Sequence, residues 1–392
     1  MTEATSGERS EHSTRLTPVT RHGAASEAST TTFMARALEL ARGVRRLTAP
    51  NPWVGCVIVK DGVVVGEGAT RPPGGAHAEV IALEQAGERA RGAEVFTTLE
   101  PCVHVGRTGP CTNALAAAGV ARVVSALEDP DPHVAGRGFA ALRASGIVVD
   151  VGDGARDAAA QLAPYIVHRR EGRSFVVLKS ATSLDGRVAA ADGESRWITG
   201  AAARADAHAL RADGQAVIVG SGTALADLPA LSIREVTGPL GPPPLRVLLD
   251  ARGRVPASGP LFDPSLAPTL VFTTERSSGA ARAAWEAAGA AVELLGPGPG
   301  GSGVDLVDLL VRLGARGVLQ ALVEGGPTVH AALLATGPVD RIVAYVAPML
   351  LGAGGRAGYG LDPGPALAAA PRYRLVRARP LGDDVCLEYE PP

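Results

Sequence analysis

The chain has 392 residues, of which 46% are hydrophobic and 20% are charged, a composition typical of globular proteins rather than disordered ones. Its 38 basic and 40 acidic side chains leave a formal net charge of −2, which argues against a surface for nucleic acid or membranes. No apolar run approaches the ~18 residues of a membrane-spanning helix, and the first thirty residues contain no apolar signal segment, so we expect a cytoplasmic protein.

The first part of the chain predicts a polar tail followed by an α/β domain. Residues 1–31 are polar and without periodicity, which is typical of a disordered tail. Between residues 32 and 151, one helix is predicted to begin with residues 34–41. Three further helices are predicted over 77–90, 111–118 and 139–144. Strands are predicted over 54–59, 63–65, 95–99, 120–127 and 147–151. The alternation of strands and helices indicates a three-layer α/β domain.

A second α/β domain is predicted over residues 174–392, after a helical or mixed connector at 152–173. Its strands are predicted over 175–180, 216–220, 245–250, 268–274, 318–323, 342–346, 373–377 and 385–389. Its helices are predicted over 201–212, 280–288, 304–313 and 328–335. The Gly/Pro-rich stretch 296–303 is expected to be a surface loop, and no internal repeat relates this domain to the first.

Four residues of the first domain, in the order His-x-Glu, Pro-Cys and Cys, carry the pattern of zinc-dependent base deaminases: His77, Glu79, Cys102 and Cys111. One imidazole and two thiolates leave the fourth tetrahedral position of a Zn²⁺ ion open to water, whose pKa then falls to about 7. Glu79 is expected to be the catalytic residue that moves protons from this water to the ring nitrogen and the departing ammonia. We therefore expect one Zn²⁺ per deaminase domain.

Taken singly, these residues are weaker signals. A lone histidine near a helix start, such as His77, is more often structural, and the eight residues between Cys102 and Cys111 differ from the common Cys-x-x-Cys spacing. The ordered combination favours a metal site over both readings. Without a secretory signal the four cysteines do not suggest disulfides, and Cys56 and Cys386 are expected to be structural.

The stretches around these ligands closely resemble the bifunctional riboflavin-biosynthesis deaminase–reductase family. The matching segments of the first domain are residues 50–57, 100–111, 129–132 and 134–138. Val103 and Gly109 depart from the residues usual in the family, but neither is a ligand position. The resemblance implies a cytidine-deaminase-like three-layer α/β/α domain that acts on a phosphorylated pyrimidine.

The second domain resembles the reductase module of the same family, which implies a dihydrofolate-reductase-like α/β fold that uses NADPH. The matching segments are 177–179, 183–186, 193–199, 219–223, 226–234, 323–328 and 347–348. Independently, Gly325-Gly326 follows a strand and opens a helix, where free backbone N–H groups can face phosphate oxygens. Gly220 and Gly222 end another strand, at the edge where open α/β sheets bind ligands. Alone, each glycine pair is more often a turn.

Contacts are implied only where the motifs match. The cofactor is expected to contact Thr182, Trp197, Thr223, Asp227, Gly326, Pro327 and Thr328. The reductase substrate is expected to contact Ser195, Arg211, Leu231, Arg234 and Glu324. The deaminase substrate is expected to contact Asn51, His104 and Arg107. Lys179 and Asp185 lie on the cofactor side of these motifs without an assigned role.

Some of these residues also have a simpler interpretation as structural or surface residues. Arg211, on a helix face, would otherwise be an ordinary solvated charge, and His104 as a fourth zinc ligand would close the site to water. Arg252 and Arg254 either bind the 2′-phosphate of NADPH or are surface arginines.

The sequence thus predicts zinc-dependent deamination of 2,5-diamino-6-ribosylamino-4(3H)-pyrimidinone 5′-phosphate and NADPH-dependent reduction of its ribosyl chain to ribityl. We expect a homo-oligomer with small-molecule substrates and neither nucleic-acid nor membrane partners. Three alternatives stay open: a paralogue that acts on a related pyrimidine, a nucleic-acid deaminase and a non-catalytic zinc module. The low aromatic content of 4% and the reductase half speak against the second, and the presence of Glu79 and Glu324 speaks against the third.

Overall fold

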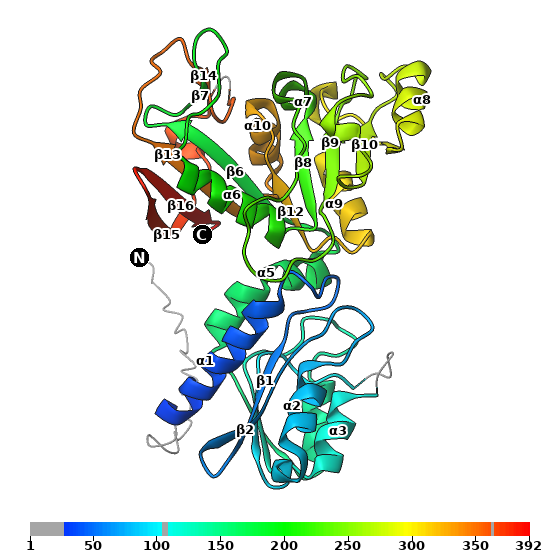
Figure 1. Cartoon of the computed structure of the whole chain (residues 1–392), viewed down its shortest axis with the longest axis vertical. Coiled ribbons are helices and arrows are strands. Elements are labelled where there is room, and N and C mark those ends of the chain that lie inside the picture. The colour runs from blue at the N-terminus through cyan, green and yellow to red at the C-terminus, as the bar shows by residue number, and fades with distance from the viewer. Residues whose placement is uncertain (1–26, 104–108, 362–363) are drawn as a thin grey trace, which may run out of the picture.

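The computed structural model describes residues 27–103, 109–361 and 364–392. Its strands form two large sheets, one of five strands and one of nine, and a separate two-stranded ribbon, β7 (Arg187–Ala189) with β14 (Arg356–Ala357). The two large sheets lie in separate domains, stacked along the long axis of the molecule (Figure 1). No helix within the described ranges is long and apolar enough to cross a membrane.

The first domain is a five-stranded sheet in the order β2-β1-β3-β4-β5. Its strands are β1 (Gly55–Lys60), β2 (Val63–Ala69), β3 (Glu94–Thr97), β4 (Arg122–Ser125) and β5 (Val148–Val151). Its helices are α1 (Glu27–Val44), α2 (Ala78–Ala86), α3 (Cys111–Ala118), α4 (Arg137–Ala144) and the connecting α5 (Ala155–Glu171), with a 3₁₀ turn η1 (Gly87–Ala90) after α2. The β1–β2 hairpin and the β1–β3 pair are antiparallel, whereas β3, β4 and β5 are parallel.

Alternation along β1 explains the layers of this domain. Cys56 and Ile58 face the cluster that contains α2, α3 and α4, while Val57 and Val59 face α1 and α5. Figure 1 shows α1 and α5 on one side of the sheet and α2 and α3 on the other. Gly55 lets α1 pack closely, because a Cβ at this position would lie 1.9 Å from the Ala37 carbonyl oxygen. The predicted three-layer α/β/α domain is confirmed.

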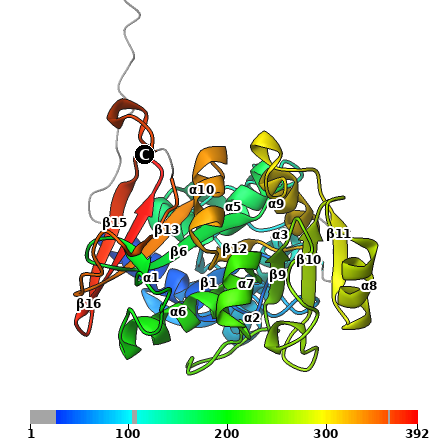
Figure 2. The same ribbon diagram turned by 90° about the horizontal axis from the view of Figure 1, so that it is seen from above.

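The second domain is built on the nine-stranded sheet β11-β10-β9-β8-β12-β6-β13-β16-β15. Its strands are β6 (Phe175–Ser183), β8 (Ala216–Gly220), β9 (Leu245–Leu249), β10 (Thr269–Thr273), β11 (Ala291–Leu294), β12 (Gln320–Val323), β13 (Arg341–Ala347), β15 (Arg374–Leu381) and β16 (Asp384–Glu390). The run from β11 to β13 is parallel, and β13, β16 and β15 are antiparallel. Figure 2 shows β15 and β16 at one margin and β11 with α8 at the other.

Helices cover both faces of this sheet. They are α6 (Ala201–Asp213), α7 (Ser221–Asp227), α8 (Gly279–Ala287), α9 (Leu306–Ala315) and α10 (Pro327–Thr336), with short 3₁₀ turns η2 (Pro260–Phe262), η3 (Pro299–Gly301) and η4 (Leu367–Ala369). Helices α9 and α10 pack on one face. Helices α6, α7 and α8 contribute to the clusters of the other face. The predicted second α/β domain is confirmed.

Most predicted elements are present, with three differences. Helix α1 begins at Glu27, inside the stretch expected to be a disordered tail, and residues 1–26 of that stretch lie outside the described residues. The connector is one continuous helix, α5. The short elements α7, β7, β11 and β14 were missed.

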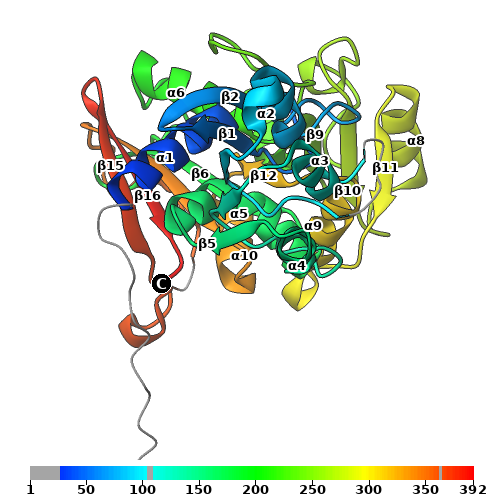
Figure 3. The same ribbon diagram turned by 90° about the horizontal axis from the view of Figure 1, so that it is seen from below.

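The two domains meet where the segment after α1 touches the second domain. Asp213 at the end of α6 accepts hydrogen bonds from Arg45 Nε (3.1 Å) and Arg46 Nε (2.7 Å). Leu319, just before β12, is fully buried in the hydrophobic cluster of the first domain. Viewed from the end of the first domain, Figure 3 shows α1 and α5 in front of the strands of the second domain. The domains therefore share part of their packing.

Candidate active sites

The three expected metal ligands converge in the first domain. His77 directly precedes α2, Cys102 follows β3, and Cys111 is the first residue of α3. His77 Nδ1 lies 3.3 Å from Cys111 Sγ and 3.5 Å from Cys102 Sγ. Among the described residues this is the one group of three or more His, Cys, Asp or Glu ligand atoms close enough to share an ion, all within 4.8 Å of one another.

The spacing and chemistry of this group fit zinc. Tetrahedral Zn²⁺ with bonds of about 2.1 Å to nitrogen and 2.3 Å to sulfur places its ligand atoms about 3.6–3.8 Å apart, close to the separations measured here. The two thiols share one hydrogen bond, which lowers the pKa of Cys102 and, together with burial, raises the pKa of Cys111. Without a metal the pair therefore holds one proton at Cys111, and metal binding would release it, because both ligands must then be thiolates.

Glu79 lies in the first turn of α2, beside the ligands, and is only 4% exposed. Burial raises the pKa of its carboxyl group to about 7, and the nearby Cys102 adds to this rise. A carboxyl group with a pKa near neutrality can both accept and donate a proton, which is the property that a proton-transfer catalyst needs.

The expected substrate contacts of the first domain are only partly described. Asn51 is half-buried in the turn before β1, and its side chain forms no hydrogen bond within the described part of the chain. Its amide is thus available to a ligand. His104 and Arg107 lie outside the described residues.

In the second domain, several expected cofactor residues gather at the carboxyl ends of three neighbouring parallel strands. Thr182 is on β6, Thr223 on α7 directly after β8, and Gly326 follows β12. Thr223 and Gly326 lie side by side, since a Cβ at Gly326 would be 3.1 Å from Thr223 Oγ1. Pro327 and Thr328 open α10 at the same place. This edge offers backbone N–H groups and hydroxyls of the kind that bind phosphate and ribose.

Arg211 and Glu324 form a bidentate ion pair at this edge. Arg211 Nε and Nη2 donate to the two Glu324 carboxylate oxygens at 2.5 and 2.9 Å, and Nη1 donates to the Ser232 carbonyl at 3.0 Å. The side chains are only 15% and 11% exposed. Arg211 is therefore not the solvated charge of the simpler reading, and most of its donors are already used.

Lys179 lies near this pair. Burial would raise the pKa of Glu324, but Arg211 and Lys179 together hold it below its usual value. Burial also lowers the pKa of Lys179, and its ammonium nitrogen is 5.8 Å from the centre of the Tyr345 ring. The structure thus places Lys179, Arg211 and Glu324 in one charge network.

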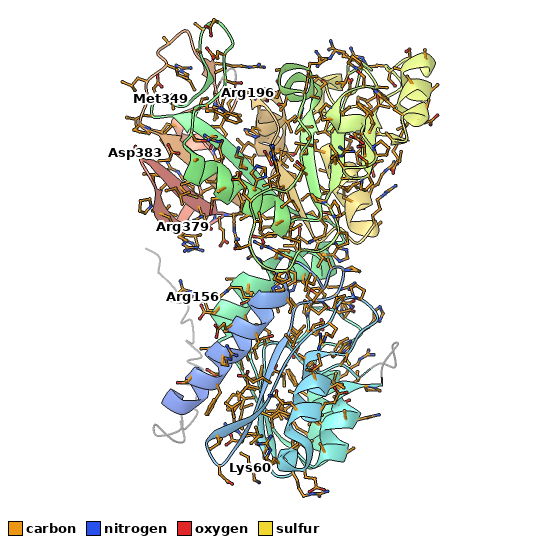
Figure 4. The ribbon with its side chains drawn as sticks, in the orientation of Figure 1. Lys60, Arg156, Arg196, Met349, Arg379 and Asp383 are labelled. Atoms are coloured by element: carbon orange, nitrogen blue, oxygen red, sulfur yellow. The ribbon has the colours of Figure 1, made fainter. Side chains whose placement is uncertain are left out.

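The remaining expected residues differ in surroundings. Trp197 is 67% exposed, with the Arg204 guanidinium 4.6 Å from its ring centre. Leu231 is buried, whereas Arg234 is exposed and forms no ion pair or hydrogen bond with any described residue. Arg196, next to Trp197, lies at the end of the second domain that is far from the first domain (Figure 4). Ser195 lies beside it in the same loop.

Asp185 holds two loops together. Its carboxylate accepts hydrogen bonds from Ser183 Oγ (2.6 Å) and from the backbone N–H groups of Leu351 (3.1 Å) and Gly352 (2.7 Å). The Ser183 bond is the main cause that lowers the pKa of Asp185 to about 2.

Asp227, at the end of α7, accepts a hydrogen bond from Arg196 through its backbone carbonyl.

The sequence analysis did not single out two histidines of the second domain, His208 and His330, that lie on helices packed on its sheet. His208 on α6 lies 3.5 Å from Arg211. His330 on α10 is 2% exposed, its Nδ1 lies 3.2 Å from the Gly358 carbonyl oxygen, and its Nε2 has no partner among the described residues. Neither stands in a motif, and a histidine in an apolar helix such as α10 gives no signal beyond burial.

Comparisons with known proteins agree with this division. Residues 27–127 match the cytidine and deoxycytidylate deaminase zinc-binding region, and residues 174–387 match the RibD C-terminal domain. The riboflavin biosynthesis protein RibD of Escherichia coli is 43% identical over 365 residues, which cover 91% of this chain and 97% of the relative.

Solved structures give the same picture. RibD of Acinetobacter baumannii superposes with a TM-score of 0.84 at 38% identity and covers 94% of this chain and 100% of its own. A Thermotoga maritima protein described as a diaminohydroxyphosphoribosylaminopyrimidine deaminase/5-amino-6-(5-phosphoribosylamino)uracil reductase has a TM-score of 0.81 at 32% identity, with coverage of 94% and 100%.

Proposed function

The chain belongs to the RibD family of riboflavin-biosynthesis enzymes, and we propose that it catalyses both reactions named for its Thermotoga maritima relative. The first is hydrolytic deamination of 2,5-diamino-6-ribosylamino-4(3H)-pyrimidinone 5′-phosphate. The second is NADPH-dependent reduction of the ribosyl chain of the product to a ribityl chain. The convergence of His77, Cys102 and Cys111 beside the buried Glu79 is the observation that carries the first assignment.

In the deaminase domain, His77, Cys102 and Cys111 would hold zinc, which supplies a water nucleophile of lowered pKa. Glu79 takes a proton from the attacking water and passes it to the pyrimidine ring nitrogen and then to the leaving ammonia. Burial raises the pKa of this carboxyl group, which favours its role as a proton carrier. Asn51 offers a donor and an acceptor to the pyrimidinone edge, and we retain His104 and Arg107 as further contacts.

In the reductase domain, the residues at the strand ends would hold NADPH, which would supply the hydride that reduces C1′ of the sugar. Thr223, Gly326 and Thr328 lie together at the strand ends, where they can orient the cofactor. The other cofactor contacts that we propose are Thr182, Trp197, Asp227 and Pro327. The glycine at 326 lets a phosphate or sugar approach the backbone closely.

We assign different tasks to the two arginines expected to bind the substrate phosphate. Arg234 is exposed and free of described partners, so it can form charge-assisted bonds to a phosphate. Arg211 instead fixes Glu324 through two hydrogen bonds and so presents a carboxylate of defined position to the substrate. Ser195 and Leu231 remain proposed substrate contacts. Asp185 acts on loop structure rather than on the cofactor.

We assign residues 32–151 to the deaminase domain, with α1 extending it to Glu27, residues 152–173 to the connector and residues 174–392 to the reductase domain. The two separate sheets support these boundaries.

We also propose a cytoplasmic homo-oligomer. Its phosphorylated substrate and NADPH support the cytoplasm. Exposed Leu375 and Val376 on the edge strand β15 support self-association, which light scattering of the purified protein can test.

One assay tests the function directly. Purified protein is given the diaminopyrimidinone phosphate with and without NADPH, and ammonia release and NADPH oxidation are followed. We expect ammonia in both samples and NADPH oxidation that lags behind it. Activity on a different pyrimidine alone would identify a paralogue with another substrate.

A further inference from the structure

Glu100 is a buried carboxylate directly before the Pro101-Cys102 pair, and it is only 4% exposed. Four backbone N–H groups of the 129–139 segment donate to it. Those of Asp129 (3.1 Å) and Gly136 (2.9 Å) bind Oε2, and those of Gly138 (2.7 Å) and Phe139 (3.2 Å) bind Oε1. No described arginine or lysine pairs with it, so these N–H groups compensate the buried charge.

The 129–139 segment also touches the ligand loop directly. A Cβ at Gly138 would lie 2.2 Å from the Pro101 carbonyl oxygen, so only glycine allows this approach. Gly138 and Phe139 are in the first turn of α4, whose free N–H groups and dipole favour an anion. The segment is anchored in turn, because the Asp129 carboxylate accepts a hydrogen bond from Tyr165 Oη of α5 at 3.2 Å.

Cys102 is held on its other side by α3. Thr112 donates to the Cys102 carbonyl oxygen through Oγ1 (3.2 Å) and through its backbone N–H (3.3 Å). The Cys111 backbone N–H donates to Cys102 Sγ at 3.4 Å. Residues 100–102, which we call the ligand loop, are therefore fixed between α3 and the 129–139 segment that binds Glu100.

We propose that Glu100 is a positioning residue for the metal site, whose carboxylate fixes the backbone of Pro101 and Cys102 so that Cys102 Sγ meets His77 and Cys111. This inference rests on the zinc site of the proposed function. The hydrogen bonds of the carboxylate go to backbone N–H groups and to none of the three ligand side chains, so it acts through the backbone of Pro101 and Cys102. Its two oxygens are needed together, because a glutamine would turn an NH₂ group toward two of the four N–H donors.

The test is a spectrum of the full chain loaded with Co²⁺ in place of zinc, since cobalt absorption reports thiolate ligation. In Glu100→Gln we expect a weaker or shifted thiolate-to-cobalt band and Co²⁺ affinity reduced by about 10- to 100-fold, the range typical of residues that orient ligands. Glu128→Gln is the matched control, because Glu128 is exposed and next to the same segment. It should leave the band and the affinity unchanged.

A second control separates positioning from stability. Leu142→Ala, a fully buried change in α4, should lower the melting temperature and leave the cobalt band in place. If Leu142→Ala changes the band as much as Glu100→Gln does, or if Glu100→Gln changes nothing, the proposal is overturned. Circular dichroism and the melting temperature verify folding of each variant, because all these positions lie in the first domain.

If Glu100→Gln does not fold, the Gly138→Ala variant tests the proposal instead. Its added methyl group would clash with the Pro101 carbonyl oxygen and so displace the same backbone. A normal cobalt band in Gly138→Ala would then overturn the proposal. Absence of any thiolate band in the parent protein would instead overturn the zinc site itself. The failure of the site and the failure of the positioning role are thus distinguishable.

Discussion

At the scale of single residues, Glu79 and Glu324, the carboxylates of the two proposed active sites, are both largely removed from solvent, but different groups surround them. Glu79 lies beside thiols, and burial raises its pKa to about 7. Glu324 is also desolvated, but Arg211 and Lys179 hold its pKa below the usual value. Glu79 is therefore suited to moving a proton, and Glu324 to remaining an anion that orients or hydrogen-bonds a ligand.

Replacing either cysteine ligand by serine tests the metal centre. Cys102→Ser and Cys111→Ser should each lose most zinc and almost all deamination, because a neutral hydroxyl is a far poorer zinc ligand than a thiolate. Elemental analysis of the purified variants measures the zinc content. Full zinc occupancy in the double variant would contradict the ligand assignment.

The two arginines of the reductase site should behave differently when replaced by alanine. Arg211→Ala leaves Glu324 buried without its main partner, which should cost about 3–5 kcal/mol of unfolding free energy. Arg234→Ala removes an exposed side chain and should change stability by less than about 0.5 kcal/mol. Arg234→Ala should instead raise the KM for the phosphorylated substrate. The increase should correspond to about 1.5–3 kcal/mol of lost binding free energy.

Urea unfolding and steady-state kinetics with phosphorylated and dephosphorylated substrate distinguish the two cases. The dephosphorylated substrate should be reduced poorly by the parent enzyme and hardly less well by Arg234→Ala. Equal penalties on both substrates would show that Arg234 does not bind phosphate.

The zinc ligands could be predicted from sequence, and the ion pair could not. His77, Glu79, Cys102 and Cys111 form an ordered motif whose residue types are dictated by the chemistry. Arg211 and Glu324 are 113 positions apart, and their pairing arises only because α6 and the end of β12 meet in the fold.

At the scale of elements, α10 carries a histidine that makes stability depend on pH. Burial is the main cause that lowers the pKa of His330 to about 4, below its ordinary value of 6.5, and nearby Lys179 adds to it. The unfolded chain therefore binds a proton more readily than the folded one. The stability from neutral His330 is fully present above pH 6.5 and is lost as the pH falls toward 4.

The variant His330→Asn should lack this dependence. Between pH 7 and pH 4, the difference in unfolding free energy between parent and variant should change by about 3 kcal/mol, in the direction that weakens the parent in acid. Urea titrations at several pH values measure the difference. Parallel curves would mean that His330 titrates normally in the folded protein.

Element prediction succeeded for most helices and strands and failed for four short elements, α7, β7, β11 and β14. The strands of the first domain were all anticipated, although three of them have only four residues. Helix α7 was missed because its seven residues include Gly222, and Gly220 and Gly222 read as a turn. That omission mattered, since α7 carries Thr223 and Asp227.

At the scale of the whole molecule, the two domains are joined by more than α5. The cores of the two domains are not fully separate, since Leu319 of the reductase half is buried in the hydrophobic cluster of the deaminase half. Arg45 and Arg46 share one carboxylate, Asp213, across the same junction. Such contacts link residues far apart in sequence, so no local pattern could have indicated them.

This junction should couple the unfolding of the domains. We expect one thermal transition for the parent chain and two for Asp213→Ala, because Arg45 and Arg46 would then face each other without their shared anion. Differential scanning calorimetry measures the transitions. Two transitions in the parent would show that the domains melt independently.

The central claim is that one chain carries two separate sites that act in order. The most direct measurement is the Glu79→Gln variant, assayed for NADPH oxidation with each of the two substrates. With the diaminopyrimidinone phosphate it should release almost no ammonia and oxidise almost no NADPH, because the proton carrier is lost while zinc is retained. With the deaminated intermediate it should oxidise NADPH at nearly the parent rate. Loss of reduction with both substrates, or parent-like ammonia release, would contradict the account.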